Sequence, residues 1–271
     1  MTTPLYSPRM TPRPLAALAL LLPFAGCAID LDLRPGATNL IEALQGPTYA
    51  QAAEWALDPY DADRRRRGTL LLASAPFAGE DLYLRLFIDY LQDAESNVRS
   101  AAAQGLGAHG RPEHARLLVP LLSDPERSVR LAAASALQRL HDPFVVDALL
   151  RSLTPSREAS FEVRAEVAEA LGQYAERRVV RALILALDDE DPAVNNRARR
   201  SLRTLTGNDL GPSPRHWLDW NDTTPDPFLA RQVYFFPAYI RPLRWFEYLP
   251  LIPQPPNEAP GTPAGLALPH S

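Results

Sequence analysis

The chain has almost no cysteine and no lysine at all. Cys27 is the single cysteine among its 271 residues, and all 28 basic residues are arginine. One cysteine excludes an intramolecular disulfide and any paired-cysteine metal or redox motif. The absence of lysine excludes Schiff-base and lysine-nucleophile chemistry.

The chain also lacks a basic surplus and a long apolar run. Its formal charge of −4 gives no reason to expect nucleic acid as a partner. The sequence contains none of the short motifs of nucleotide-binding loops, zinc proteases or serine hydrolases. We therefore expect no catalytic residues, no metal, no cofactor and no enzyme activity.

The amino terminus has the organisation of an export signal. Arg9 and Arg13 are the only charges before Cys27, and an uninterrupted apolar run of ten residues extends from Leu15 to Phe24. Such a run is too short to span a bilayer, which takes about 20 residues. It fits the hydrophobic core of a secretory signal behind a basic region. Met1 and Met10 are both candidate start residues.

Phe24, Ala25 and Gly26 lead directly into Cys27, and this segment resembles the bacterial lipobox. The resemblance implies removal of residues 1–26, acylation of Cys27 and a linker over 27–37. Phe24 departs from the leucine usual in the motif, so an ordinary signal cleaved near Cys27 is the alternative. Because Ala28 follows the cysteine, the resemblance implies a lipoprotein of the outer membrane, where the cell has one.

One block of residues recurs along the middle of the chain. Each copy has an acid, a valine five residues later, usually an arginine next, and a leucine eight residues after the valine. The valines are spaced by 31, 34 and 31 residues. These repeat residues are Asp93, Val98, Arg99, Asp124, Val129, Arg130, Glu158, Val163, Arg164, Asp189 and Val194. A fixed period in this range is typical of a stacked-repeat array.

Each block predicts the first helix of a pair. Asp58, Asp124 and Asp191 each precede a proline, a combination that suits a helix start. Second helices are expected at 49–57, 114–122, 144–153 and 179–187, and the repeat beginning at Asp58 uses Arg64 and Leu71. The array is expected to extend over 38–206, with five clear first helices and a degenerate pair at 38–57.

The repeated acid-Pro-x-x-x-Val-Arg pattern resembles HEAT-like repeats of the phycobilisome-lyase type. The resemblance implies an all-α fold, a right-handed α-solenoid of antiparallel helix pairs. The residues that follow the repeats predict an irregular aromatic and proline-rich carboxy-terminal extension. It does not imply the lyase reaction. HEAT-like metal hydroxylases carry His-Glu pairs at repeat spacing, and this sequence has none.

Stacked units place equivalent residues side by side. We therefore expect each valine to pack between units and each repeat arginine to reach the acid of a neighbouring unit, forming a ladder that fixes the stacking register. An anion-binding row of arginines is the alternative. The cluster from Arg64 to Arg67 is read as a solvated helix face.

The repeat stops at Thr206, and residues 207–252 are rich in aromatic side chains. Trp217 and Trp220 are expected to cap the last unit, with an exposed ligand platform as the alternative. Trp245 belongs to a segment that lies either along the solenoid or against a membrane or partner. Residues 253–271 are proline-rich and predicted to be disordered.

These features favour a non-enzymatic protein-protein interaction scaffold held at the bacterial cell envelope through Cys27. Its unknown protein or peptide partner is expected on a concave face lined mostly by second helices. One alternative is a lyase-like accessory protein that handles a small ligand or chromophore. Another is a structural spacer of the envelope.

Overall fold

The computed structural model describes residues 47–237 and 260–267. Within these residues it contains eleven α-helices and no β-strand, only two isolated bridges. None of the helices among the described residues is long and apolar enough to cross a membrane. The signal sequence, Cys27 and Trp245 lie outside the described residues.

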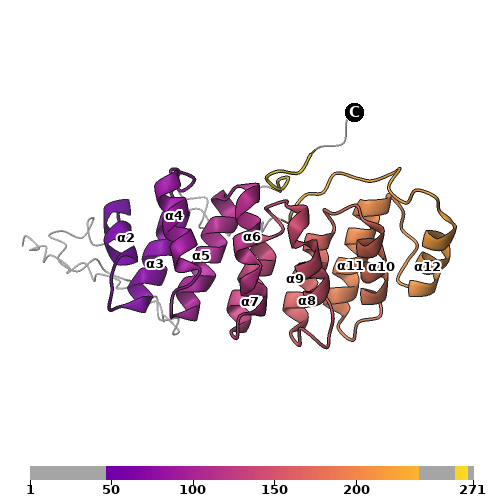
Figure 1. Ribbon diagram of the computed structural model, residues 1–271, viewed down its shortest axis with the longest axis horizontal. Helices are drawn as coiled ribbons and strands as arrows, with labels where there is room; N and C mark the ends of the chain where they lie inside the picture. Colours follow the sequence, from indigo (N-terminus) through magenta and orange to yellow (C-terminus); the bar gives the residue numbers. More distant parts are fainter. Residues whose placement is uncertain (1–46, 238–259, 268–271) are drawn as a thin grey trace, which may run out of the picture. The chain divides into compact units, whose positions relative to one another are not determined.

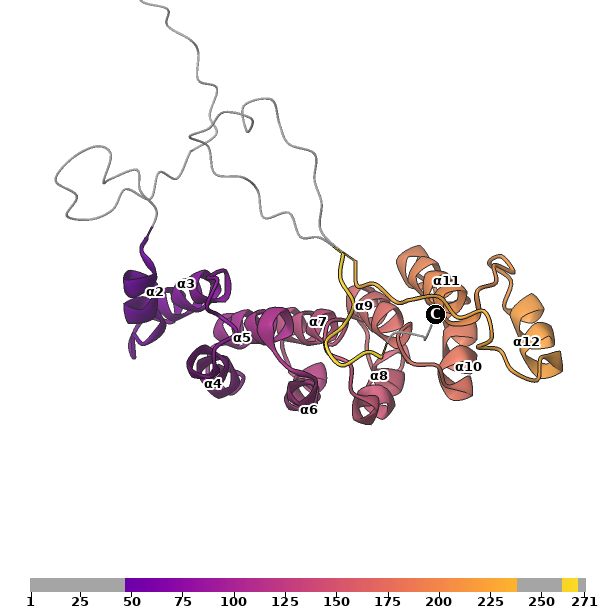
Figure 2. The same ribbon diagram turned by 90° about the horizontal axis from the view of Figure 1, so that it is seen from above.

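The helices stand side by side as a series of pairs (Figure 1). Seen from above, they form two rows (Figure 2). The first-helix row contains α3 (Ala62–Ala73), α5 (Ser96–His109), α7 (Arg127–Ala136), α9 (Phe161–Leu171) and α11 (Pro192–Thr206). The second-helix row contains α4 (Asp81–Tyr90), α6 (Ala115–Leu118), α8 (Val146–Ser152) and α10 (Arg177–Ala186). The fold is the α-solenoid that the repeat pattern predicts.

The repeat valines and leucines supply the core between these rows. The eight positions are fully shielded from solvent: Val98, Leu106, Val129, Leu137, Val163, Leu171, Val194 and Leu202. The spacing of eight residues from valine to leucine is close to two helical turns, so both side chains of a unit lie on one face. Burial of a single Val or Leu contributes about 1.5–3 kcal/mol, and stacking repeats them in every unit.

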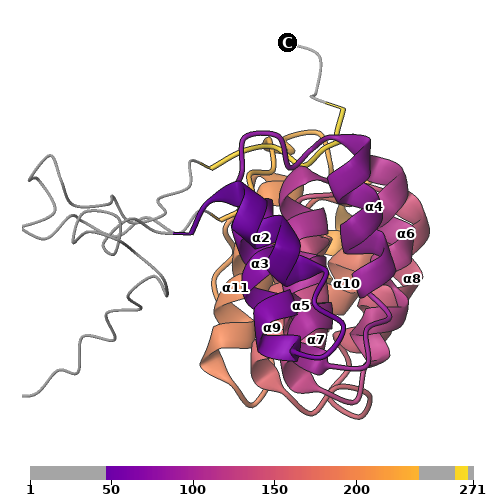
Figure 3. The same ribbon diagram turned by 90° about the vertical axis from the view of Figure 1, so that its left-hand side faces the viewer.

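Helix α2 (Tyr49–Ala56) departs from the predicted pattern. The sequence predicts a second helix here, but α2 lies in line with α3 and α5 instead of beside α4 (Figures 2 and 3). Gly68 of α3 allows this placement because its missing Cβ leaves room for the backbone of Ala52 and Ala56. The two helices therefore pack backbone against backbone.

The repeat beginning at Asp58 is shifted by one residue. Leu72 is the fully buried leucine, and Leu71 is only partly buried. The reason is that α3 begins at Ala62, one residue later after its acid than α5 does after Asp93. The prediction that Arg64 and Leu71 are the repeat residues is wrong; Arg65 and Leu72 take those positions.

The predicted helix over 114–122 is interrupted. It consists of a 3-10 turn at Pro112–His114, the short α6, and a second 3-10 turn at Pro120–Ser123. Pro120 has no backbone N–H to donate, so the α-helical hydrogen bonding ends before it. This unit consequently has the shortest second helix of the row.

Helix α12 (Pro214–Thr223) packs against α10 at the end of the array. Trp217 is fully buried in the common core, and its indole N–H donates to the carbonyl of Gly211 at 2.8 Å. The Trp220 ring meets it edge-on at 6.0 Å. Arg177 of α10 donates to the carbonyls of Asn221 and Thr224 and so joins the carboxy-terminal end of α12 to α10.

After α12 the chain runs back across the ends of the preceding units (Figures 1 and 2). We call residues 231–236 and 261–264 the carboxy-terminal strap. The Gln232 N–H donates to the Thr204 carbonyl at 2.8 Å, and the Phe236 N–H donates to the Gly261 carbonyl at 3.0 Å. The Ala264 N–H donates to the Arg139 carbonyl at 2.8 Å, and the Ala264 carbonyl accepts from the His141 N–H at 2.9 Å. The strap therefore connects the ends of α11 and α7.

The predicted disorder of 253–271 does not hold at 260–267, where the structure describes the chain. Two features fix this part: the backbone hydrogen bonds of Ala264, and the close approach of Gly261 to the Phe236 ring. The rest of the predicted segment lies outside the described residues.

Candidate interaction surface

Arginines of successive units form a ladder of ion pairs along the loop ends of the array. Each Nε lies 2.6–3.0 Å from a carboxylate of the next unit, and the same guanidinium donates a second bond to the other carboxylate oxygen. The pairs are Arg65 with Asp93, Arg99 with Asp124, Arg130 with Glu158, and Arg164 with Asp189. Such two-pronged contacts fix orientation as well as distance.

Each ladder arginine also binds its own turn. Arg164 donates to the carbonyls of Glu158 and Ala159 at 2.9 and 3.0 Å, and Arg99 donates to those of Asp93 and Ala94 at 2.8 and 3.0 Å. One side chain thus holds the turn of its own unit and the acid of the next. The bond to Asp189 raises the pKa of Arg164 above its ordinary value, so the pair stays ionised.

The repeat acids organise the turns rather than capping the helices directly. Asp93 and Asp124 each accept a hydrogen bond from the backbone N–H two residues later, at 2.8 and 2.9 Å. The helix begins only after that turn, behind Glu95 in α5 and Glu126 in α7. The acid therefore serves two contacts at once, the turn and the arginine of the preceding unit.

The ladder ends at Asn195, which occupies the arginine position in α11. Its side-chain amide donates to the carbonyls of Leu187 and Asp189 at 2.7 and 3.0 Å. Asn195 thus replaces the contacts that the other arginines make to their own turns and is too short to reach a further unit. The replacement of arginine by asparagine at position 195 therefore coincides with the end of the ladder.

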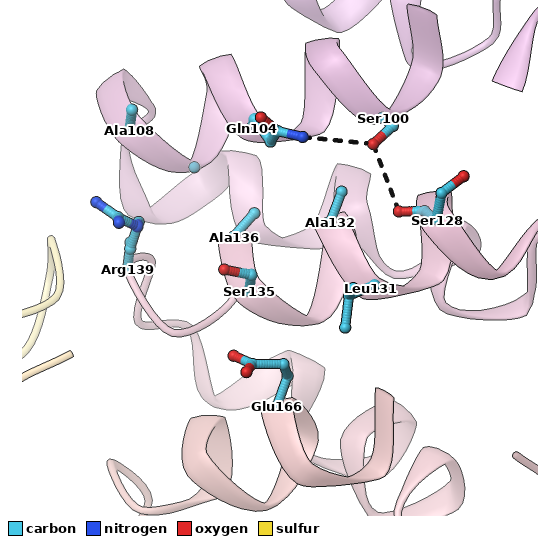
Figure 4. A pocket seen from close by; sticks show the side chains of 11 residues that line it. Ser100, Gln104, Ala108, Ser128, Leu131, Ala132, Ser135, Ala136, Arg139 and Glu166 are labelled. Atoms are coloured by element: carbon cyan, nitrogen blue, oxygen red, sulfur yellow. Dashed lines mark hydrogen bonds between the residues drawn. The ribbon is translucent and has the colours of Figure 1, made fainter. Parts of the chain in front are cut away.

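A groove of about 600 Å³ runs along the first-helix row (Figure 4). We call it the first-helix groove. Ser100, Gln104 and Ala108 of α5 form one side, and Ala132 and Ala136 of α7 lie at its base. Leu131, Ser135 and Arg139 border it from the α7 side, and Glu166 of α9 lies beyond them.

Small side chains leave this groove open. Gly107 lies so close to α7 that an added Cβ would be 2.6 Å from the Cβ of Ala136. Close approach of the two helices and alanine or serine at the surface positions together leave a shallow channel. Gln104 and Ser100 are joined at 3.4 Å, and Ser100 also donates to the Ser128 carbonyl at 3.4 Å.

The strap borders one end of the first-helix groove. The Arg139 guanidinium lies 4.6 Å from the centre of the Phe236 ring, and the Arg139 carbonyl accepts from Ala264. At Glu166, the side-chain amide of Gln138 donates to both the carbonyl and the carboxylate. The charged groups of the groove, Arg139 and Glu166, therefore lie on its α7–α9 side.

A second groove, of about 710 Å³, lies between the loop ends of two units. We call it the loop groove. Val119, Pro120 and Leu122 of one unit and Ala148 of the next supply apolar lining, and Arg151 and Arg157 supply charge. The ladder residues Asp124, Arg130 and Glu158 also contribute to it.

A binding face lined mostly by second helices stays a prediction. Of the two grooves, the first-helix groove is formed by α5, α7 and α9, and the loop groove touches the second-helix row. The residues of the first-helix groove fall outside the repeated acid, valine, arginine and leucine positions, so the repeat pattern gave no signal for them. The loop groove includes the repeat residues Asp124, Arg130 and Glu158, but its Arg151 and Arg157 lie outside the repeated positions.

The histidines are dispersed over the described residues. His109 contacts the Ala73 carbonyl at 2.6 Å, and His114 accepts from the Arg111 N–H at 3.0 Å. His141 stacks on Tyr174 at 4.8 Å, and its burial lowers its pKa below the ordinary value. No three metal-ligating side chains gather anywhere in the described parts of the chain.

Comparison with known families identifies the repeats. Residues 84–159 match the family described as HEAT repeats, and residues 163–189 match the PBS lyase HEAT-like repeat. No curated protein matches the chain.

Among solved structures, the complex of CpcE and CpcF of phycocyanin lyase from Nostoc sp. PCC7120 is similar with a TM-score of 0.53 and 22% identity. The match covers 65% of this chain and 69% of that one. A designed armadillo repeat protein matches with a TM-score of 0.47 and 17% identity, over 68% of this chain and 95% of that one. At these identities the likeness is one of fold.

Proposed function

We propose that this HEAT-repeat chain is a non-enzymatic interaction scaffold that receives a segment of a partner protein in the first-helix groove. The open channel across α5 and α7 carries the proposal, because it combines a small-residue base with polar groups along its length. A channel of this kind admits a peptide or a helix edge without rearrangement of the helices that form it.

The ion-pair ladder supports the same role. Bidentate pairs at every junction from α3 to α11 hold the units in register. A surface that is already ordered loses little conformational freedom on binding, which favours affinity. The ladder lies at the loop ends and leaves the first-helix groove open to a partner.

Filling the groove tests the proposal. Ala108 is exposed and borders the groove, so Ala108→Trp is expected to reduce recovery of the partner at least tenfold. Ala94 is also exposed but lies in the turn before α5, outside the groove, and Ala94→Trp should leave recovery unchanged. The measurement is quantitative affinity purification of the full chain from solubilised cell envelopes. A wild-type chain recovered without any stoichiometric protein would overturn the scaffold role.

We further propose that the chain is a bacterial lipoprotein acylated at Cys27 and held at the cell envelope. The short apolar run and the lipobox-like segment before Cys27 support this. Several acyl chains together anchor a protein stably, since each buried CH₂ contributes about 0.8 kcal/mol.

The anchor is tested independently of the groove. Mass spectrometry of the mature chain should show an acylated amino-terminal Cys27, and Cys27→Ser should move the protein from the membrane fraction to the soluble fraction. Ala25→Ser, a small-for-small change in the same segment, should preserve both. A mature amino terminus that begins elsewhere, or an unmodified thiol at Cys27, would contradict the anchor without touching the scaffold role.

A further inference from the structure

The loop groove contains two arginines that the ladder does not use. Arg151 lies in the last turn of α8, and Arg157 lies in the turn that leads to α9; both are exposed. Neither side chain has an ion pair or hydrogen bond with any residue in the described ranges 47–237 and 260–267. Most other arginines of the array are paired, so these two stand out.

The other charges of the loop groove are already balanced. Asp124 binds Arg99, and Glu158 binds Arg130, each through two hydrogen bonds. With Arg99 counted as the partner of Asp124 from outside the lining, Arg151 and Arg157 leave a surplus of two positive charges, in a chain whose formal charge is −4. The lining residues alone, three arginines and two acids, carry a surplus of one. This local surplus attracts an anionic group and opposes a cationic one.

Part of the lining beside these charges is apolar. Val119, Pro120, Leu122 and Ala148 face the same groove of about 710 Å³. The break in the second helix at Pro120 contributes to this shape, because residues 120–123 continue as a 3-10 turn instead of a full helix. Free phosphate or another small anion would use the charge and leave this apolar lining uncovered.

We propose that the loop groove binds an acidic segment of a protein partner, with carboxylates on Arg151 and Arg157 and an apolar side chain against the apolar part of the lining. Arginine suits this task because its planar guanidinium binds a carboxylate through two parallel hydrogen bonds. The inference rests on the proposed scaffold role and adds a second contact to it, with a defined chemistry. The first-helix groove and the loop groove then bind different segments of one partner.

A synthetic peptide tests the chemistry directly. The probe is a fluorescein-labelled peptide of alternating glutamate and leucine, titrated with the full mature chain and followed by fluorescence anisotropy. We expect binding that weakens with added salt and falls at least tenfold in the Arg151→Glu, Arg157→Glu double variant. A glutamine-leucine peptide should bind at least tenfold more weakly than the glutamate-leucine peptide.

Arg85→Glu serves as the matched control, because Arg85 is also exposed and has no ion pair among the described residues. It changes the net charge in the same direction, outside the groove, and should retain peptide binding. No binding of the acidic peptide, equal binding of the glutamine peptide, or equal loss in the Arg85 variant would each overturn the inference.

Envelope purification separates this inference from the scaffold proposal. Loss of the partner in Ala108→Trp with full retention in the Arg151, Arg157 double variant would uphold the scaffold and reject the acidic contact. Loss in both supports both. Peptide binding by a chain that recovers no partner would leave the loop groove as an acidic-peptide site and reject the scaffold role.

Discussion

Arg164→Ala is expected to destabilise the array by about 3–5 kcal/mol, the cost of breaking a buried ion pair by removing one partner. The side chains of Arg164 and Asp189 are only 7% and 2% exposed, the lowest values in the ladder. The variant leaves Asp189 without its guanidinium and two carbonyls of the turn without their donor. Chemical denaturation followed by circular dichroism measures the loss.

Arg64→Ala is the matched control for this prediction. Arg64 is 59% exposed and pairs at the surface with Asp58, so its removal should cost about 0–1 kcal/mol. Hydrogen exchange adds a second measurement: in Arg164→Ala the amides of α10 and α11 should lose protection more than those of α5. Equal losses for Arg164→Ala and Arg64→Ala would show that the ladder does not hold the register.

Gly68→Ala is expected to cost about 3 kcal/mol or more, because α2 and α3 leave no room for a methyl group at this position. The added Cβ would lie 2.5 Å from the carbonyl oxygen of Ala52 and against the backbone nitrogen of Ala56. These are backbone atoms of a helix and cannot move aside as a flexible side chain would. Overpacking usually costs about 1–3 kcal/mol, and contact with backbone places this site at the upper end or beyond.

The chain supplies a control for the same chemical change. A Cβ at Gly79 meets nothing within 4 Å, and Gly79 is exposed in the loop before α4. Gly79→Ala should therefore be neutral, or slightly stabilising through the unfolded state. Limited proteolysis should cut near α2 in Gly68→Ala alone. Retention of wild-type stability in that variant would show that α2 is not held by the close contact.

The solenoid was predictable because its signal is repeated. Valine, arginine and leucine recur at spacings that match helical turns, and four copies outweigh irregularities in any one of them. Single-copy features were not predictable in the same way. The extra residue between Asp58 and α3 moved the register from Arg64 to Arg65, and no repeat pattern reports an insertion in a turn.

The grooves were less accessible to sequence reasoning than the fold. Ala132, Ala136 and Ser135 look like ordinary helix-surface residues, and only the stacking of α5, α7 and α9 brings them to one channel. Arg151 and Arg157 carry no mark in the sequence that distinguishes them from paired arginines. They differ from the paired arginines because no acid of a neighbouring unit lies within reach of them. That distance depends on how the units stack and cannot be read from the sequence.

The carboxy-terminal strap changes how the array behaves as a chain of units. In a simple solenoid each unit touches only its neighbours, so melting spreads inward from an end one unit at a time. Here the strap bonds Thr204 after the middle of α11, the Gln173 carbonyl after α9 and Arg139 after α7. The strap therefore links three successive units. We expect the carboxy-terminal half of the array to unfold as one cooperative block, whereas the amino-terminal half unfolds one unit at a time.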